Sequence, residues 1–211
     1  MGSSLSIKSR ATLGNSQGCG NRLHSDAVSA PVLIHLVRHG EAAQRWVEAR
    51  DPALSERGRA QAEAAAARLA AAPPMALRTS PLRRAQETAA PLATRWQQNP
   101  VVDEAFREVP GPDDFAARPA WIADLMQANW SHVDAAVKAW RIRLWDALLA
   151  LEEDTVIHTH FMVINAAVSI LTQAPQVVVF EPDYCSMTVL ARHGKHISLQ
   201  ELGASRMTQV L

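Results

Sequence analysis

The chain has 211 residues, the length of one domain or of one domain that carries an insertion. Lysine plus arginine and aspartate plus glutamate both number 21, so the formal net charge is zero. This balance argues against nucleic acid or a membrane as a general partner, although a local basic pocket is compatible with it. No apolar run approaches the roughly 18–20 residues that span a bilayer.

The first thirty residues differ in composition from the rest of the chain. Residues 1–30 are rich in Ser, Gly, Asn and Gln, and their few apolar residues follow no helical or strand period. We expect a disordered leader, because the segment offers little apolar surface to offset the entropy lost on ordering. An organelle transit peptide is the alternative, since the segment is basic and holds no acid before Asp26. The domain is expected to cover residues 31–211.

The two cysteines, Cys19 and Cys185, are too few for a disulfide framework or a four-thiolate zinc site. We therefore expect free thiols and a cytoplasmic protein.

Strand patterns alternate with helix patterns along the domain. Ser55 is a plausible N-cap, Pro81 fits a first helical turn, and Ser131 with Asp134 three residues later resembles a capping box. The predicted elements are a strand at 32–37, a helix at 54–71, a weak strand at 75–79, a helix at 81–96, a short strand at 101–102, helices beginning near 119 and just after 131, a strand at 155–159, a helix at 162–172, and strands at 186–191 and 196–202.

This alternation predicts an α/β fold, a three-layer α/β/α sandwich with a mainly parallel central sheet. Residues 110–152, between two predicted strands, are expected to form a small helical lid insertion. In such sheets the chemistry gathers at the carboxyl ends of the strands. Three of these ends carry polar groups: Arg38 with His39, Ser80 leading to Arg83 and Arg84, and His160.

Two histidines and a pair of arginines at one edge of a sheet indicate a phosphate site. The guanidinium group is a planar fork of donors that matches an oxyanion, and it stays charged at physiological pH. A neutral imidazole is a competent nucleophile, and neighbouring arginines lower its pKa. A second histidine can stabilise the phosphoryl group during transfer.

Several blocks of the sequence, in order, resemble the histidine phosphatase superfamily, in the branch that contains phosphoglycerate mutases and related phosphatases. They are Val37-Arg-His-Gly-Glu41, Leu54-Ser-Glu-Arg-Gly-Arg-Ala-Gln-Ala62, Thr79-Ser-Pro-Leu-Arg-Arg-Ala-Gln-Glu-Thr-Ala89, Phe106-Arg-Glu108 and Val156-Ile-His-Thr-His160. The resemblance runs from about residue 32 to about residue 202.

The resemblance implies a role for each matching residue. His39 is the nucleophile that becomes phosphohistidine, Arg38 and Arg84 bind the phosphoryl group, and His160 is the second histidine of the pocket. Glu108 donates a proton to the leaving oxygen and later accepts one from water.

Arg45 and Arg83 are candidates for the substrate rim. The sequence departs from the family where Ala42, Ala43 and Gln44 follow Glu41, and where Phe161 follows His160.

Two features admit a second interpretation. His35 and His158, together with His39 and His160, give histidine spacings that suggest zinc, but no carboxylate or thiolate stands at ligand spacing and the arginines would repel a dication. We therefore expect no metal and no cofactor. The four tryptophans Trp121, Trp130, Trp140 and Trp145 either pack the lid or form an apolar wall over the pocket.

The expected function is hydrolysis of a small phosphorylated substrate through a phosphohistidine. A phosphoglycerate mutase-type phosphotransferase and a non-catalytic phosphate-recognition module are the alternatives. About 50 residues between Glu108 and His160 leave room for only a small lid, which favours hydrolysis. The sequence leaves the oligomeric state open.

Overall fold

A six-stranded sheet forms the centre of the computed structural model, which describes residues 30–45 and 48–205. The expected leader at 1–30 falls outside these ranges except for its last residue. The strand order is β3-β2-β4-β1-β5-β6. The strands are β1 (Val32–Arg38), β2 (Ala76–Thr79), β3 (Val101–Val102), β4 (Thr155–Thr159), β5 (Met187–His193) and β6 (His196–Glu201). The first four strands in spatial order run parallel to one another. β5 is antiparallel to β1 and β6 is antiparallel to β5, so the sheet is mainly parallel as predicted.

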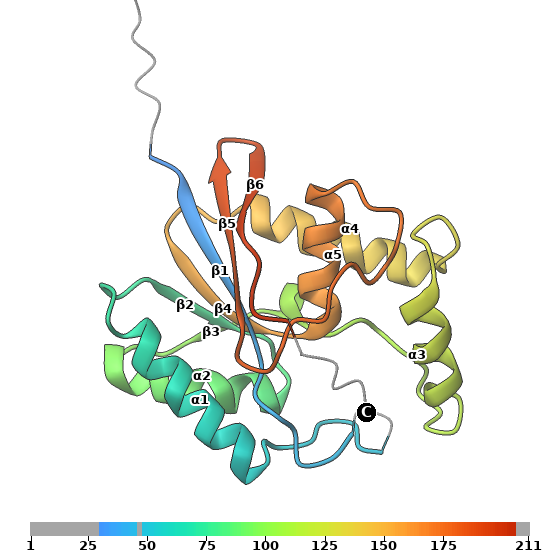
Figure 1. The fold of residues 1–211 in the computed structure, drawn as a ribbon, viewed down its shortest axis with the longest axis horizontal. Helices are drawn as coiled ribbons and strands as arrows, with labels where there is room; N and C mark the ends of the chain where they lie inside the picture. The colour runs from blue at the N-terminus through green and yellow to red at the C-terminus, as the bar shows by residue number, and fades with distance from the viewer. Residues whose placement is uncertain (1–29, 46–47, 206–211) are drawn as a thin grey trace, which may run out of the picture.

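Helices cover both faces of this sheet (Figure 1). On one face lie α1 (Glu56–Leu69) and α2 (Arg83–Trp96), and on the other lie α4 (Ala135–Leu149) and α5 (Phe161–Leu171). The helix α3 (Arg118–Gln127) stands at the side of the molecule, away from the sheet, and a short 3-10 helix, η1 (Glu104–Phe106), follows β3. The three-layer α/β/α prediction is confirmed.

Alternation along the strands builds two cores. Leu36 and its neighbour Val37 are both fully buried, yet they belong to different clusters because successive strand residues point to opposite faces. Leu36 packs in the cluster that includes α4 and α5, and Val37 packs with Leu69 of α1 and Leu92 of α2. β4 is buried along its whole length, as expected for a central parallel strand.

Two predicted helix starts differ from the structure. α4 is capped by Asp134, whose carboxylate accepts from the backbone N–H of Val137 at 2.8 Å, so Ser131 as N-cap is wrong. Ser131 lies in the preceding turn, where its carbonyl accepts from Lys138. α2 begins at Arg83 rather than at Pro81. The predicted cap of α1 is confirmed, since Ser55 Oγ accepts from Gly58 N at 2.9 Å.

The segment predicted as a lid contributes two helices with different surroundings. α4 packs against α5 and η1 and buries Val137, Leu144 and Leu148, so it completes a helical layer. Trp130 and Trp140 are buried in the same cluster, which favours the packing interpretation of the tryptophans.

Within the described residues, no helix is long and apolar enough to cross a membrane.

Candidate active site

The carboxyl ends of three neighbouring strands meet at one edge of the sheet. Arg38 pairs with Thr159 between β1 and β4, and Thr79 pairs with His158 between β2 and β4. The residues that follow, His39, Ser80 and His160, are therefore brought together from distant parts of the sequence. A cavity of about 460 Å³ opens here, and Arg38, His39, Arg84 and Glu108 line it.

The imidazole of His39 is held at both nitrogens. Its Nδ1 lies 2.7 Å from the carbonyl oxygen of Gly40, and its Nε2 lies 3.1 Å from Nε of Arg84. A carbonyl only accepts and the guanidinium only donates, so the proton sits on Nδ1 and the lone pair on Nε2. Burial, followed by the charges of Arg84 and Arg38, holds the pKa of His39 well below its usual 6.5. The ring is thus neutral, with Nε2 available as a nucleophile.

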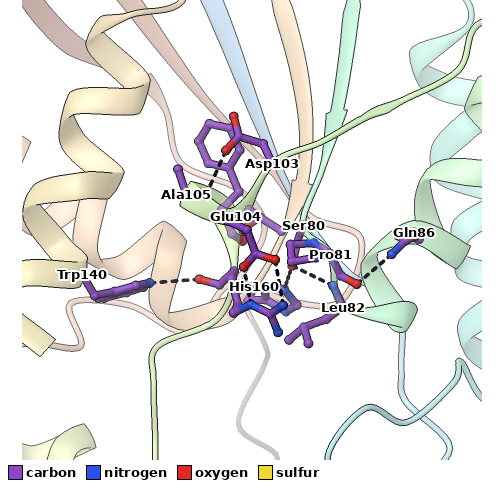
Figure 2. Close-up of polar contacts among 12 residues, drawn as sticks. Ser80, Pro81, Leu82, Gln86, Asp103, Glu104, Ala105, Trp140 and His160 are labelled. Carbon is purple, nitrogen blue, oxygen red and sulfur yellow. Dashed lines mark hydrogen bonds and ion pairs between the residues drawn. The ribbon is translucent and has the colours of Figure 1, made fainter. Parts of the chain in front are cut away.

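His160 lies beside His39, with ring centroids 5.2 Å apart. Its Nε2 is 2.6 Å from Ser80 Oγ, a contact between the ends of β4 and β2 that Figure 2 shows. The other nitrogen, Nδ1, is buried and has no hydrogen-bond partner among the described residues. Burial and then the charge of Arg84 lower the pKa of His160 well below 6.5. A buried ring nitrogen without a partner is costly. His160 itself is fully buried and, unlike Arg38 and His39, is not among the residues that line the cavity.

Arg38 is fixed by the segment that precedes β5. Its guanidinium donates to the carbonyl of Pro182 at 2.7 Å and lies 4.2 Å from the ring centre of Tyr184. The ring of Phe161 lies on it at 5.2 Å. Cation–π contacts of this kind restrict the guanidinium plane without consuming all its donors. Arg38 is buried, as is Arg84, so the site holds two positive charges in a region poor in water.

Glu108 borders the same cavity, close to the N-terminus of α5. Its carboxylate accepts from the backbone N–H of Val109 at 3.0 Å and of Met162 at 3.5 Å. Burial raises the pKa of Glu108 above 4.5, although Arg84 and the two backbone N–H groups act in the opposite direction. A carboxyl with a raised pKa can keep its proton at higher pH than an exposed one, as a general acid requires.

The loop that carries His39 is packed tightly against α1 and α2. Gly40 N donates to Thr88 Oγ1 at 3.0 Å. A Cβ on Gly40 would lie 2.5 Å from the Gly58 carbonyl oxygen, and one on Gly58 would lie 2.0 Å from that of Glu41. Only glycine fits at these two positions, since the clashes would be with backbone atoms.

The two predicted rim arginines have different surroundings. Arg45 lines the cavity, where its Nε donates to Glu48 at 2.7 Å. Arg83 does not line it: its guanidinium is exposed and donates to Glu87 at 2.7 Å. Of the adjacent pair, Arg84 is the arginine that faces His39.

The histidines considered for zinc are dispersed. Nδ1 of His35 lies 3.3 Å from the sulfur of Met187, and His158 is buried with a hydrogen bond to the backbone of Arg78. Among the described residues, no group of three or more His, Cys, Asp and Glu side chains is placed to hold a metal ion.

Several residues around the cavity had no role in the sequence interpretation. Ser80 was noted only as a polar strand end, and its hydroxyl contacts His160. Tyr184 and Glu181 come from a loop without a recognisable motif, and Ile122 and Met126 come from α3. A signal existed for Ser80, in its position after a buried strand; the loop residues carried none.

The family model of the histidine phosphatase superfamily, branch 1, matches residues 34–205. The chain belongs to this superfamily. A search of curated proteins finds no match.

Solved structures of this superfamily's fold resemble the chain over most of its length. A mycobacterial glucosyl-3-phosphoglycerate phosphatase is 27% identical, with a TM-score of 0.65, and the match covers 83% of this chain and 100% of that one. YhfR of Bacillus stearothermophilus (24%, TM-score 0.65, 80% and 95% covered) and a phosphoserine phosphatase of Entamoeba histolytica (17%, TM-score 0.62, 83% and 98% covered) share the fold.

Proposed function

We propose that the chain is a phosphomonoester hydrolase that transfers the phosphoryl group to His39 and then to water. The observation that carries this proposal is the neutral His39 imidazole, whose Nε2 lone pair faces Arg84 inside the cavity. Membership of the superfamily and the similarity to structures named as phosphatases support hydrolysis.

The positive end of the cavity suits a phosphate dianion. Arg38 and Arg84 supply two buried charges, and charge-assisted hydrogen bonds to phosphate are strong in such surroundings. The NH1 group of Arg84 and Nδ1 of His160 have no hydrogen-bond partner among the described residues. Both could donate to phosphate oxygens if His160 carries its proton on Nδ1, which would satisfy two costly buried groups.

In the first step, the lone pair on Nε2 of His39 forms a bond to phosphorus as the bond from phosphorus to the ester oxygen breaks. Glu108, in its protonated form, gives its proton to that oxygen, so an alcohol leaves. Arg38, Arg84 and His160 stabilise the charge on the equatorial oxygens during transfer. Arg84 must turn its Nε–H from His39 to the phosphate for the attack to occur.

In the second step, water attacks the phosphohistidine. The Glu108 carboxylate takes a proton from the water, the bond from nitrogen to phosphorus breaks, and inorganic phosphate leaves. His39 is again neutral, with its proton on Nδ1, and Glu108 is again protonated. The cycle consumes one ester and one water and needs no metal.

The test combines turnover with detection of the intermediate. The protein should hydrolyse phenyl phosphate with or without a chelator, and a rapid acid-free quench should trap a phosphoenzyme that is labile to acid and missing in His39→Ala. Activity lost to chelator and restored by zinc would overturn the mechanism, as would full activity in His39→Ala. Isomerisation of phosphoglycerate faster than its hydrolysis would show a mutase instead, and phosphate binding without turnover of any ester would show a recognition module.

A further inference from the structure

We infer that the preferred substrates are phosphate monoesters of apolar alcohols or phenols, and that esters with a second anionic group are disfavoured. This inference rests on the proposed function and adds the class of leaving group. It comes from the outer wall of the cavity, which we define as Val109, Ile122, Met126, Phe161 and Met162.

The outer wall is apolar and is assembled from three separate segments. Ile122 and Met126 stand four residues apart on α3, one helical turn, so they share one face of that helix. Phe161 and Met162 open α5, and Val109 follows Glu108. The wall therefore begins beside the group proposed to protonate the leaving oxygen, which is where the organic part of the ester must lie.

Met126 is the residue of the outer wall that most clearly indicates contact with an apolar ligand. It is 38% exposed, one of few large apolar side chains that the described residues leave open to solvent. Ile122, by contrast, is partly buried and packs against the main core cluster. A flexible, polarisable methionine in such a position is suited to contact an apolar ligand of variable shape.

The charges at the mouth of the cavity disfavour a second anion. Among the described residues, the charged side chains that line the cavity outside the phosphate end are Arg45, Glu48 and Glu181, one positive and two negative. The guanidinium of Arg45 is already engaged by Glu48, with Nε 2.7 Å from Oε1. A substrate carboxylate would meet an acidic excess there, and like charges at short range repel.

The arginines just outside the cavity do not change this balance. Arg50 and Arg107 border a separate hollow, which shares Glu108 and Val109 with the cavity. Arg107 is bound to Glu104 at 2.6 Å and Arg50 to Asp113 at 3.3 Å. Among the described residues, neither lines the cavity itself, so the arginine at its mouth is Arg45, which Glu48 already binds.

The experiment compares phenyl phosphate with 4-carboxyphenyl phosphate, which differ by one carboxylate far from the ester bond. We expect kcat/KM to be about tenfold higher for phenyl phosphate, as expected for one unfavourable charge contact at a partly exposed site. Dissociation constants of both esters are measured by calorimetry on His39→Ala, which does not turn them over. His39→Ala should also bind phenyl phosphate more tightly than 4-carboxyphenyl phosphate.

Variants of the wall locate the preference. Met126→Ala should lower kcat/KM for phenyl phosphate about threefold to fivefold, because it removes apolar contact area from the leaving group. Ile142→Ala is the matched control, since Ile142 is a 62% exposed apolar residue of α4 away from the cavity, and it should behave as the parent. Glu181→Gln should reduce the discrimination against 4-carboxyphenyl phosphate.

Equal or tighter binding of the carboxylate ester would overturn the inference, and so would failure of His39→Ala to bind either ester. Equal kcat/KM for both esters, with hydrolysis intact, would overturn it while leaving the proposed function standing. No hydrolysis of either ester by the parent, with phenyl phosphate still bound preferentially, would support the inference and overturn the proposed function.

Discussion

Nε of Arg84 lies 3.1 Å from Nε2 of His39, so an arginine side chain donates directly to the nitrogen proposed as nucleophile. The contact requires that nitrogen to be unprotonated, and it places a positive charge where a phosphate would enter. The charge of Arg84 thus helps to lower the pKa of His39, and in the proposed mechanism its guanidinium donors bind the phosphate.

Arg84→Lys should lower kcat/KM by about 10²-fold, because an ammonium group keeps the charge but loses the planar fork. Steady-state hydrolysis of phenyl phosphate measures the effect. Arg83→Lys is the matched comparison at the adjacent position, where the guanidinium is exposed and bound to Glu87. Its kcat/KM should stay within about twofold of that of the parent, because exposed ion pairs contribute little. Equal losses of kcat/KM in the two variants would contradict the assignment of Arg84, rather than Arg83, as the phosphate-binding arginine.

The pH profile of kcat/KM should favour mildly acidic conditions. The proposed mechanism needs a neutral His39 and a protonated Glu108. The pKa of His39 lies well below 6.5 and that of Glu108 above 4.5, so the active protonation state persists on the acid side and is lost as Glu108 ionises with rising pH. Glu108→Gln should remove this alkaline limb and lower kcat/KM for phenyl phosphate by about 10²-fold.

The leaving group provides a control for the Glu108 prediction. 4-Nitrophenol leaves readily as an anion, so 4-nitrophenyl phosphate should lose much less activity than phenyl phosphate in Glu108→Gln. An equal loss for both esters would indicate that Glu108 acts on something other than the leaving oxygen.

Gly58→Ala should destabilise the fold and disturb the site together. Alanine improves helix propensity by about 1 kcal/mol, but its Cβ would lie 2.0 Å from the Glu41 carbonyl oxygen. We expect a net loss of about 2 kcal/mol in the free energy of unfolding and a fall in kcat, since the His39 loop must shift. Urea unfolding and turnover measure these. Ala64→Gly, at an exposed position of α1, should cost about 1 kcal/mol with turnover unchanged.

His158 should make stability depend on pH. Burial lowers its pKa from 6.5 to about 4 in the folded state. The unfolded chain therefore binds the proton first, and the folded state loses about 1.4 kcal/mol per pH unit as pH falls from about 6.5 to about 4, about 3 kcal/mol in total. Urea unfolding at several pH values in this window measures the free energy of unfolding, which should fall less steeply with falling pH in His158→Gln than in the parent. Identical slopes would show that His158 does not carry the effect.

The strand ends were the most predictable part of the molecule. The buried run before Arg38, the polar tip after β4 and the parallel arrangement imply one edge of one sheet, and the structure places Arg38, His39, Arg84 and Glu108 around one cavity there. The start of α4 was less predictable, because Ser131 and Asp134 are both good caps and only the turn before the helix decides between them.

The contacts across the chain could not be predicted from local patterns. Tyr184 has no periodic or motif signal, yet its ring lies 4.2 Å from the Arg38 guanidinium. Cys185 adopts a positive φ of 54°, unusual for a residue with a side chain, and its N–H donates to the Arg38 carbonyl. Such contacts depend on how the antiparallel strand β5 returns beside β1, which residue spacing does not encode.

The contact between Arg38 and the segment from Pro182 to Tyr184 makes the loop before β5 part of the site. A protein truncated after α5 would retain every residue assigned from the motifs, from Arg38 to His160, but not the groups that orient the first arginine. Searches for shortened or fused versions of this enzyme should therefore treat the motif-free loop before β5 as indispensable. A recombinant fragment chosen from the recognisable blocks alone would also lack β5 and β6, so β1 would lose its antiparallel partner and Arg38 the groups that orient it.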